Sequence, residues 1–156
     1  MGPPAGGPRG PCACLGIMGT DGTPDQVITD LLTTPARWAV VGLSTNRSRP
    51  AYGVAAYVQS LGHTVVPVHP RAETVHGAAG YRRLAEVPDP VDVVDVFVNS
   101  ARAGAVVDEA VAVGARVVWL QLGVRDPAAE ERARAAGLVV VVDRCPAIEG
   151  RARGLG

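Results

Sequence analysis

The sequence contains no lysine, and arginine supplies all fifteen of its Lys and Arg residues. This absence excludes a lysine Schiff base, a P-loop lysine and an amine nucleophile, because a guanidinium stays protonated and cannot act as a base. Arginine instead holds phosphates and carboxylates with a planar fork of donors. The formal net charge is zero, which argues against nucleic acid as a partner, since binding a phosphate backbone needs a basic surface.

Cysteine is also scarce. The chain has three, Cys12, Cys14 and Cys145, and an odd number with wide spacing is not a disulfide framework. A metal site would need more ligands than the Cys12-Ala13-Cys14 segment provides. We therefore expect free thiols and no metal site.

Long hydrophobic runs are missing as well. The apolar runs are far shorter than the ~20 residues of a membrane helix, and the first residues lack the charged and apolar regions of a secretory signal. We expect a cytoplasmic protein with no membrane partner. Residues 1–20, rich in Gly and Pro, are expected to be disordered, with Met18 as an alternative start, and residues 21–156 to form a single domain.

Apolar strand patterns alternate with helical patterns along the rest of the chain. This alternation predicts an α/β, three-layer Rossmann-like fold with a mainly parallel five-stranded sheet. Ligands of such sheets bind beyond the carboxyl ends of the strands, where the strand order reverses. Strands are predicted at 38–43, 63–69, 91–99, 116–122 and 138–143, helices at 25–34, 51–61, 102–113, 126–136 and 146–153, and a helical turn at 81–87.

The segment 42–50, after the first predicted strand, has the composition of an anion site. Gly42 allows a sharp turn and a close approach of ligand to backbone, Ser44 is a short donor, and Arg47 and Arg49 are forked cations. The next helix would point its N-terminal amides at this loop. The segment therefore predicts a phosphate or pyrophosphate site; the alternative is an exposed polar loop with solvated arginines.

The end of the second predicted strand argues against ordinary NAD binding. NAD sites of this fold carry an acidic residue there for the ribose hydroxyls, but the chain reads His69-Pro70-Arg71. Arg71 could neutralise a ribose phosphate, which points to coenzyme A, with its 3′-phosphate, or to NADP. The alternative is a capped strand end with a surface charge.

Other polar residues near the predicted strands are less specific. Asn99 and Gln121 end strands on the ligand side. Asp92 and Asp95 are placed near a strand start, where hydrogen bonding to strand ends or helix capping is the expected role. Cys145 follows Arg144, which could make its thiol reactive. A mixed disulfide with a ligand thiol is one hypothesis, and a buried inert cysteine is the alternative.

Four stretches together carry a resemblance to a known family. They are WAVVGLSTNRSRPAYGVAAYVQSLGHTVVPVHP (38–70), VPDPVDVVDVFVN (87–99), GARVVWLQLGV (114–124) and AGLVVVVDRCPAIE (136–149). Their order and spacing resemble the stand-alone CoA-binding domain proteins, which are similar to the CoA-binding domain of the succinyl-CoA synthetase α subunit. The family commonly has Asn where this chain has His69 and Arg where it has Val98.

The resemblance implies a protein that binds coenzyme A or an acyl-CoA without catalysis of its own, since other domains supply catalysis in the synthetases. A partner enzyme is compatible with this role. An NADP-dependent oxidoreductase, or a thiol-redox protein using Cys145 with CoA, remain the alternatives. The candidate binding residues from loop composition and resemblance are Gly42, Ser44, Arg47, Arg49, Pro50, Tyr52, His69, Pro70, Arg71, Phe97, Val98, Asn99, Gln121, Gly123 and Val124.

Overall fold

The computed structural model describes residues 24–156. The predicted disordered segment 1–20, with Cys12, Cys14 and Met18, lies outside the described residues. The elements are α1 (Pro24–Thr33), β2 (Arg37–Val41), α2 (Pro50–Ser60), β3 (Thr64–Val68), the 3₁₀ turn η2 (Leu84–Glu86), β4 (Val93–Val96), α3 (Ser100–Ala112), β5 (Val117–Leu120), α4 (Pro127–Ala135), β6 (Val139–Val141) and α5 (Pro146–Ala152).

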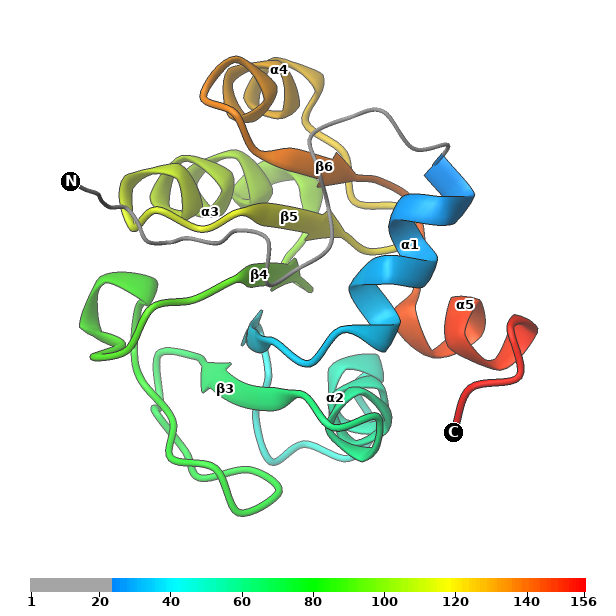
Figure 1. The fold of residues 1–156 in the computed structure, drawn as a ribbon. Coiled ribbons are helices and arrows are strands. Elements are labelled where there is room, and N and C mark those ends of the chain that lie inside the picture. Colours follow the sequence, from blue (N-terminus) through cyan, green and yellow to red (C-terminus); the bar gives the residue numbers. More distant parts are fainter. Residues whose placement is uncertain (1–23) are drawn as a thin grey trace, which may run out of the picture.

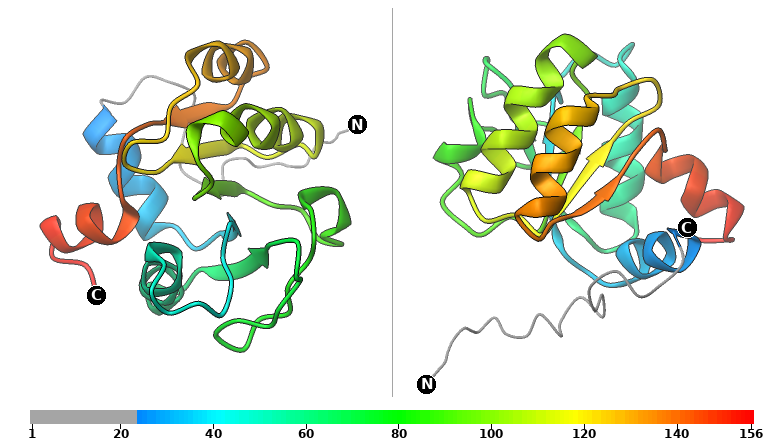
Figure 2. Two further views of the ribbon diagram at one scale, coloured as in Figure 1. Left: turned by 180° about the vertical axis from the view of Figure 1, so that it is seen from behind. Right: turned by 90° about the horizontal axis from the view of Figure 1, so that it is seen from above.

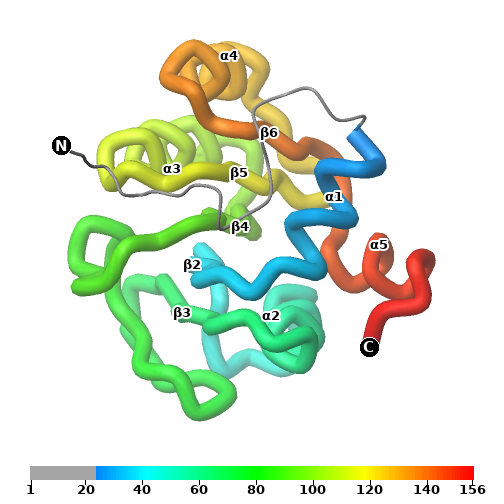
Figure 3. Tube along the Cα trace, in the orientation of Figure 1, coloured from blue at the N-terminus to red at the C-terminus, as the bar shows by residue number. Residues whose placement is uncertain are grey.

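The strands form a five-stranded sheet in the order β3-β2-β4-β5-β6, and every neighbouring pair is parallel. Figures 1 and 3 show the strands side by side between the helices. Valine-rich runs suit these positions, because a parallel sheet is buried on both faces and β-branched side chains pack well on it. The predicted three-layer Rossmann-like fold is thus confirmed.

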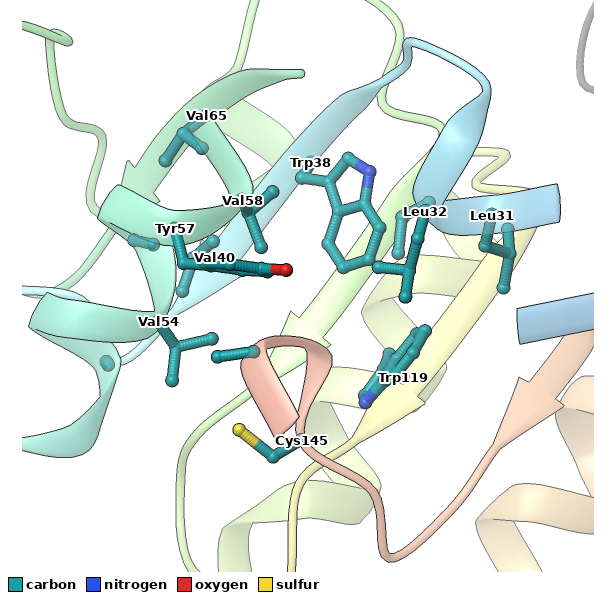
Figure 4. Close-up of a cluster of buried hydrophobic side chains, with 14 of the residues drawn as sticks. Leu31, Leu32, Trp38, Val40, Val54, Tyr57, Val58, Val65, Trp119 and Cys145 are labelled. Carbon is teal, nitrogen blue, oxygen red and sulfur yellow. The ribbon is translucent and has the colours of Figure 1, made fainter. Parts of the chain in front are cut away.

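Two groups of helices cover the two faces of the sheet (Figure 2). On one side α1, α2 and α5 pack on a core that contains Trp38 and Trp119, whose rings are 5.6 Å apart between centroids. Figure 4 shows these two indoles beside Leu31 and Leu32 of α1. On the other side α3, α4 and η2 bury a second, valine- and alanine-rich core.

The strand order fixes where a ligand site can form. From β2 the chain first moves outward to β3, and it then returns to place β4 on the opposite side of β2. The loops after β2 and β4 therefore leave the sheet in different directions and open a crevice between them. Gly42, just after β2, and Phe97, just after β4, lie in close contact at this end of the sheet.

The strands are shorter than the sequence pattern predicts, and the difference lies at their ends. The predicted strand 91–99 is reduced to Val93–Val96. Before it, a carboxylate oxygen of Asp92 accepts the backbone N–H of Arg37 at 2.9 Å. After it, the backbone N–H of Phe97 still donates to Val41 of β2 at 2.9 Å, and Val98 and Asn99 then lead into α3. None of the helices in residues 24–156 combines the length and the apolar character that a membrane span requires.

A buried histidine joins α1 to the sheet. Nδ1 of His63 accepts the backbone N–H of Ala36 at 3.2 Å, and its Nε2 lies 3.0 Å from the carbonyl oxygen of Leu32. This pairing requires the neutral ring with its proton on Nε2. Burial lowers the pKa of His63, and the Leu32 contact only partly opposes that effect.

We expect acid to destabilise the fold through His63. Its pKa is lower in the folded state than in the unfolded chain, so protonation favours unfolding as pH falls below about 6.5. The His63→Gln variant should lack this contribution. Urea unfolding at pH 7.5 and 5.5 measures it: the loss of unfolding free energy on acidification should be smaller in the variant. Equal losses in both proteins would contradict the assignment.

Candidate functional site

The loop after β2 turns at Gly42, whose backbone has φ of 103°. Its N–H donates to the carbonyl of Val68 at 2.8 Å, which holds the loop against the end of β3. A Cβ at this position would lie 3.1 Å from Cβ of Phe97. Glycine therefore meets two needs here, a left-handed backbone and a close approach to the loop after β4.

Side chains within the loop hold it in shape. Oγ of Ser44 accepts the backbone N–H of Asn46 at 3.2 Å. Oδ1 of Asn46 in turn accepts the N–H and the hydroxyl of Ser48 at 3.0 and 2.6 Å. The loop leads into α2 through Arg49, whose side chain does not cap the helix. The positive end of α2 is thus not occupied by a side-chain cap.

The loop after β3 is attached to this first loop by Glu73. Its Oε1 accepts both the N–H and the hydroxyl of Thr45, at 3.0 and 3.1 Å. These hydrogen bonds, led by the backbone one, lower the pKa of Glu73. Arg71 lies 4.0 Å from the other carboxylate oxygen. Glu73 therefore fixes the relative position of two loops at the crevice, and its carboxylate partly balances the charge of Arg71.

A wide cleft of about 920 Å³ opens at this end of the sheet. It extends from the loop after β2, past the end of β3, to η2 and the first turns of α3. Its lining is rich in polar and basic side chains. The residues are Val41, Gly42, Ser44, Asn46, Arg49, Val68, His69, Pro70, Arg71, Arg82, Arg83, Glu86, Phe97, Val98, Asn99, Arg102, Val106 and Glu109.

A narrow cleft of about 290 Å³ lies on the α2 side and shares Gly42, Arg49 and Phe97 with the wide one. Its lining is mainly apolar. Cys145, immediately before α5, is 9% exposed as a residue, and Figure 4 shows its sulfur pointing to the α2 side, where Val54 lies. The residues are Gly42, Arg49, Pro50, Ala51, Val54, Phe97, Gln121, Leu122, Val124 and Cys145.

A buried carboxyl group lies behind the narrow cleft. Asp95 of β4 is fully buried, and its Oδ1 accepts the Nε2 of Gln121 at 2.6 Å. Its Oδ2 has no hydrogen-bond partner among the described residues. Burial raises the pKa of Asp95 to about 8, although the bond from Gln121 opposes this shift. Asp95 is therefore mainly protonated at neutral pH, and it holds a side chain that lines the cleft.

Comparison with known families decides the relationship of the chain. The family described as CoA binding domain matches residues 36–151, which include both clefts. The chain belongs to the CoA-binding domain family.

Two individual proteins are similar to this chain over most of their length. The chain is 31% identical over 118 residues to the uncharacterized protein YneT of Bacillus subtilis, covering 76% of this chain and 87% of YneT. It is 34% identical to a hypothetical protein from Pyrococcus horikoshii, with a TM-score of 0.79, covering 87% of this chain and 96% of that one.

A larger enzyme contains a related portion. An acetyl-coenzyme A synthetase from Ca. Korarchaeum cryptofilum, solved with phosphate and ADP, is 28% identical with a TM-score of 0.62. The similarity covers 70% of this chain and 26% of the synthetase. The CoA-binding domain resemblance expected from the sequence is therefore confirmed.

The structure brings most of the predicted binding residues of this CoA-binding domain together. Gly42, Ser44, Arg49, Pro50, His69, Pro70, Arg71, Phe97, Val98, Asn99, Gln121 and Val124 line one cleft or both.

Three predicted residues line neither cleft. The guanidinium of Arg47 lies over the ring of Tyr52, 5.8 Å from its centroid. Tyr52 also packs on His76, at 4.3 Å between centroids. The N–H of Gly123 donates to Oδ1 of Asp143 at 2.9 Å. These contacts give the three residues structural roles, and contact with a ligand remains a prediction for every residue of the set.

The sequence-based set did not include the far wall of the wide cleft. Arg82 and Arg83 line it because the preceding residue, Tyr81, is attached to the end of β3. The N–H of Tyr81 donates to the carbonyl of Pro67, and its carbonyl accepts the N–H of His69. Arg102 lines the same wall from α3. The Arg82-Arg83 pair was the only local sign of a second anion site, and a sequence pattern of this kind does not show where its loop lies in the fold.

Proposed function

We propose that the chain binds coenzyme A, or an acyl-CoA, through the loop after β2 and without catalysis of its own. The observation that carries this proposal is the pair of clefts of opposite character that meet at Gly42, Arg49 and Phe97. Coenzyme A has the same division, a highly charged nucleotide half and an uncharged pantetheine arm. The family membership supports the same ligand.

The polar or apolar lining of each cleft indicates the orientation of the bound coenzyme A. The nucleotide and its phosphates would occupy the wide cleft, where Arg49 faces the crevice beside the uncapped N-terminus of α2. The pantetheine arm would follow the narrow cleft, where Phe97 and Val54 offer apolar contact and Gln121 offers an amide. Its thiol, or an acyl group on it, would then lie on the side of Cys145.

The family membership favours CoA over NADP as the ligand. A mixed disulfide between CoA and Cys145 would need a thiolate at a site that is 9% exposed. The position of Cys145 in the narrow cleft allows the contact. It does not by itself supply the chemistry, and we therefore propose binding alone.

Calorimetric titration of the full chain with CoA tests the proposal. Arg49→Ala should weaken CoA binding by about ten- to a hundred-fold, because hydrogen bonds to charged groups contribute about 1.5–3 kcal/mol. The variant should fold normally, since Arg49 is exposed and forms no side-chain cap.

Arg134→Ala is the matched control. Arg134 is also an exposed arginine, but it lies on α4, and it lines neither of the two clefts. Its removal should leave the affinity unchanged. Equal affinity of the wild type and the Arg49→Ala variant would exclude the first loop as the phosphate site, and absence of binding by the wild type would reject the proposed function.

A further inference from the structure

Further arginines, outside the loop after β2, line the wide cleft. Arg82 and Arg102 both line it, and both are exposed. In the described part of the chain, neither guanidinium has an ion pair or a hydrogen bond, whereas the neighbouring Arg83 lies 4.0 Å from Glu86. Glu86 and Glu109 also line the cleft, but within the described residues neither forms an ion pair with Arg82 or Arg102. Two cations without a partner in one cleft favour an anionic group there.

The position of Arg102 strengthens this inference. It lies in the first turn of α3, which begins at Ser100 and has no acidic residue in that turn. A cation is unfavourable there, because the N-terminus of a helix carries partial positive charge. An anion bound at this point would interact favourably with both the guanidinium and the helix.

The position of Arg82 is fixed by backbone bonds. The adjacent Tyr81 donates its N–H to Pro67 at 3.0 Å, and its carbonyl accepts the N–H of His69 at 2.9 Å. These bonds hold the segment beside the carboxyl end of β3. The segment that carries Arg82 is therefore attached to the sheet where β3 ends.

We propose that Arg82 and Arg102 bind the 3′-phosphate of coenzyme A and give the cleft its preference for CoA over ligands that lack this group. The inference rests on the proposed function, in which the loop after β2 takes the pyrophosphate. A second phosphate, attached to the ribose, then needs a second cationic site in the same cleft. Arg71, the sequence-based candidate, lies 4.0 Å from Glu73, so part of its charge is already balanced.

The test compares CoA with 3′-dephospho-CoA by calorimetry. Wild type should bind CoA at least about ten-fold more tightly, the effect of one or two charge-assisted hydrogen bonds. In the Arg82→Ala/Arg102→Ala double variant this ratio should fall close to one, through weaker CoA binding alone. Arg71→Ala should keep the ratio, and thermal unfolding checks that each variant is folded.

The outcomes separate the two proposals. If wild type binds neither ligand, the proposed function fails and this assignment fails with it. If CoA binds but the double variant keeps the wild-type ratio, or loses affinity for both ligands equally, only the 3′-phosphate assignment is overturned. A ratio that collapses in Arg71→Ala instead would place the phosphate at the end of β3.

Discussion

Replacing Asp95 by asparagine should stabilise the protein at alkaline pH. The folded state binds a proton at Asp95 up to a pKa of about 8, because the group is fully buried. In the unfolded chain an aspartate loses its proton near pH 4. The unfolding free energy of the wild type should therefore fall as pH rises from about 4 to about 8, and this contribution is absent from a side chain that cannot ionise.

The expected size can be measured by urea unfolding at pH 5 and pH 8. The advantage of Asp95→Asn over wild type should be larger at pH 8 by roughly 2–4 kcal/mol. At pH 5 the unfolding free energies of the two proteins should be closer, because the wild type has lost little stability to ionisation of the unfolded chain at that pH. The asparagine must also still accept the hydrogen bond from Nε2 of Gln121 through its own oxygen. Parallel pH profiles for the two proteins would show that Asp95 does not titrate as described.

Asp95 also shows where reading the sequence reached its limit. The predicted strand 91–99 was too long, and it placed Asp95 near a strand start, away from the ligand. In the structure β4 covers Val93–Val96, and Asp95 is hydrogen-bonded to Gln121, which lines the narrow cleft. The expected role of hydrogen bonding at a strand end holds for Asp92. For Asp95 it was wrong, because burial against β5 is a property of the sheet and not of the local sequence.

The fold itself was predictable for a physical reason. Each strand is mainly apolar, as in Val139–Val141, and each amphipathic helix has a clear beginning or end. Gly62, Gly114 and Gly137, which follow predicted helices, all have positive φ in the structure. These signals are local, and a sheet of alternating βα units needs little more to define its topology.

The far wall of the cleft depends on contacts that no local pattern reveals. Residues 69–92 contain only one short 3₁₀ turn, η2, and the bonds of Tyr81 to β3 decide where Arg82 lies. The position of the loop after β2 could be predicted from the sequence, since Gly42 directly follows a strand and Arg49 directly precedes a helix. Position along the chain therefore predicted the near wall of the site and not the far one.

Gly42→Ala should reduce both stability and ligand binding. A residue with a side chain is strained at φ of 103°, and its Cβ would lie 3.1 Å from Cβ of Phe97. We expect a loss of about 2–3 kcal/mol of unfolding free energy, from the backbone strain and the added contact. CoA binding should weaken at least about ten-fold, since the methyl group enters the point where the two clefts meet.

Gly62→Ala separates the two effects. Gly62 has nearly the same backbone, with φ of 100°, but a Cβ there would meet nothing within 4 Å, and it lies beyond α2, away from both clefts. Its replacement should cost only the strain, about 1–2 kcal/mol, and should leave CoA affinity unchanged. Thermal or urea unfolding and calorimetry of both variants give the comparison. Equal affinities in the two variants would mean that the ligand does not approach the backbone at Gly42, and the meeting point of the clefts would then not be the phosphate site.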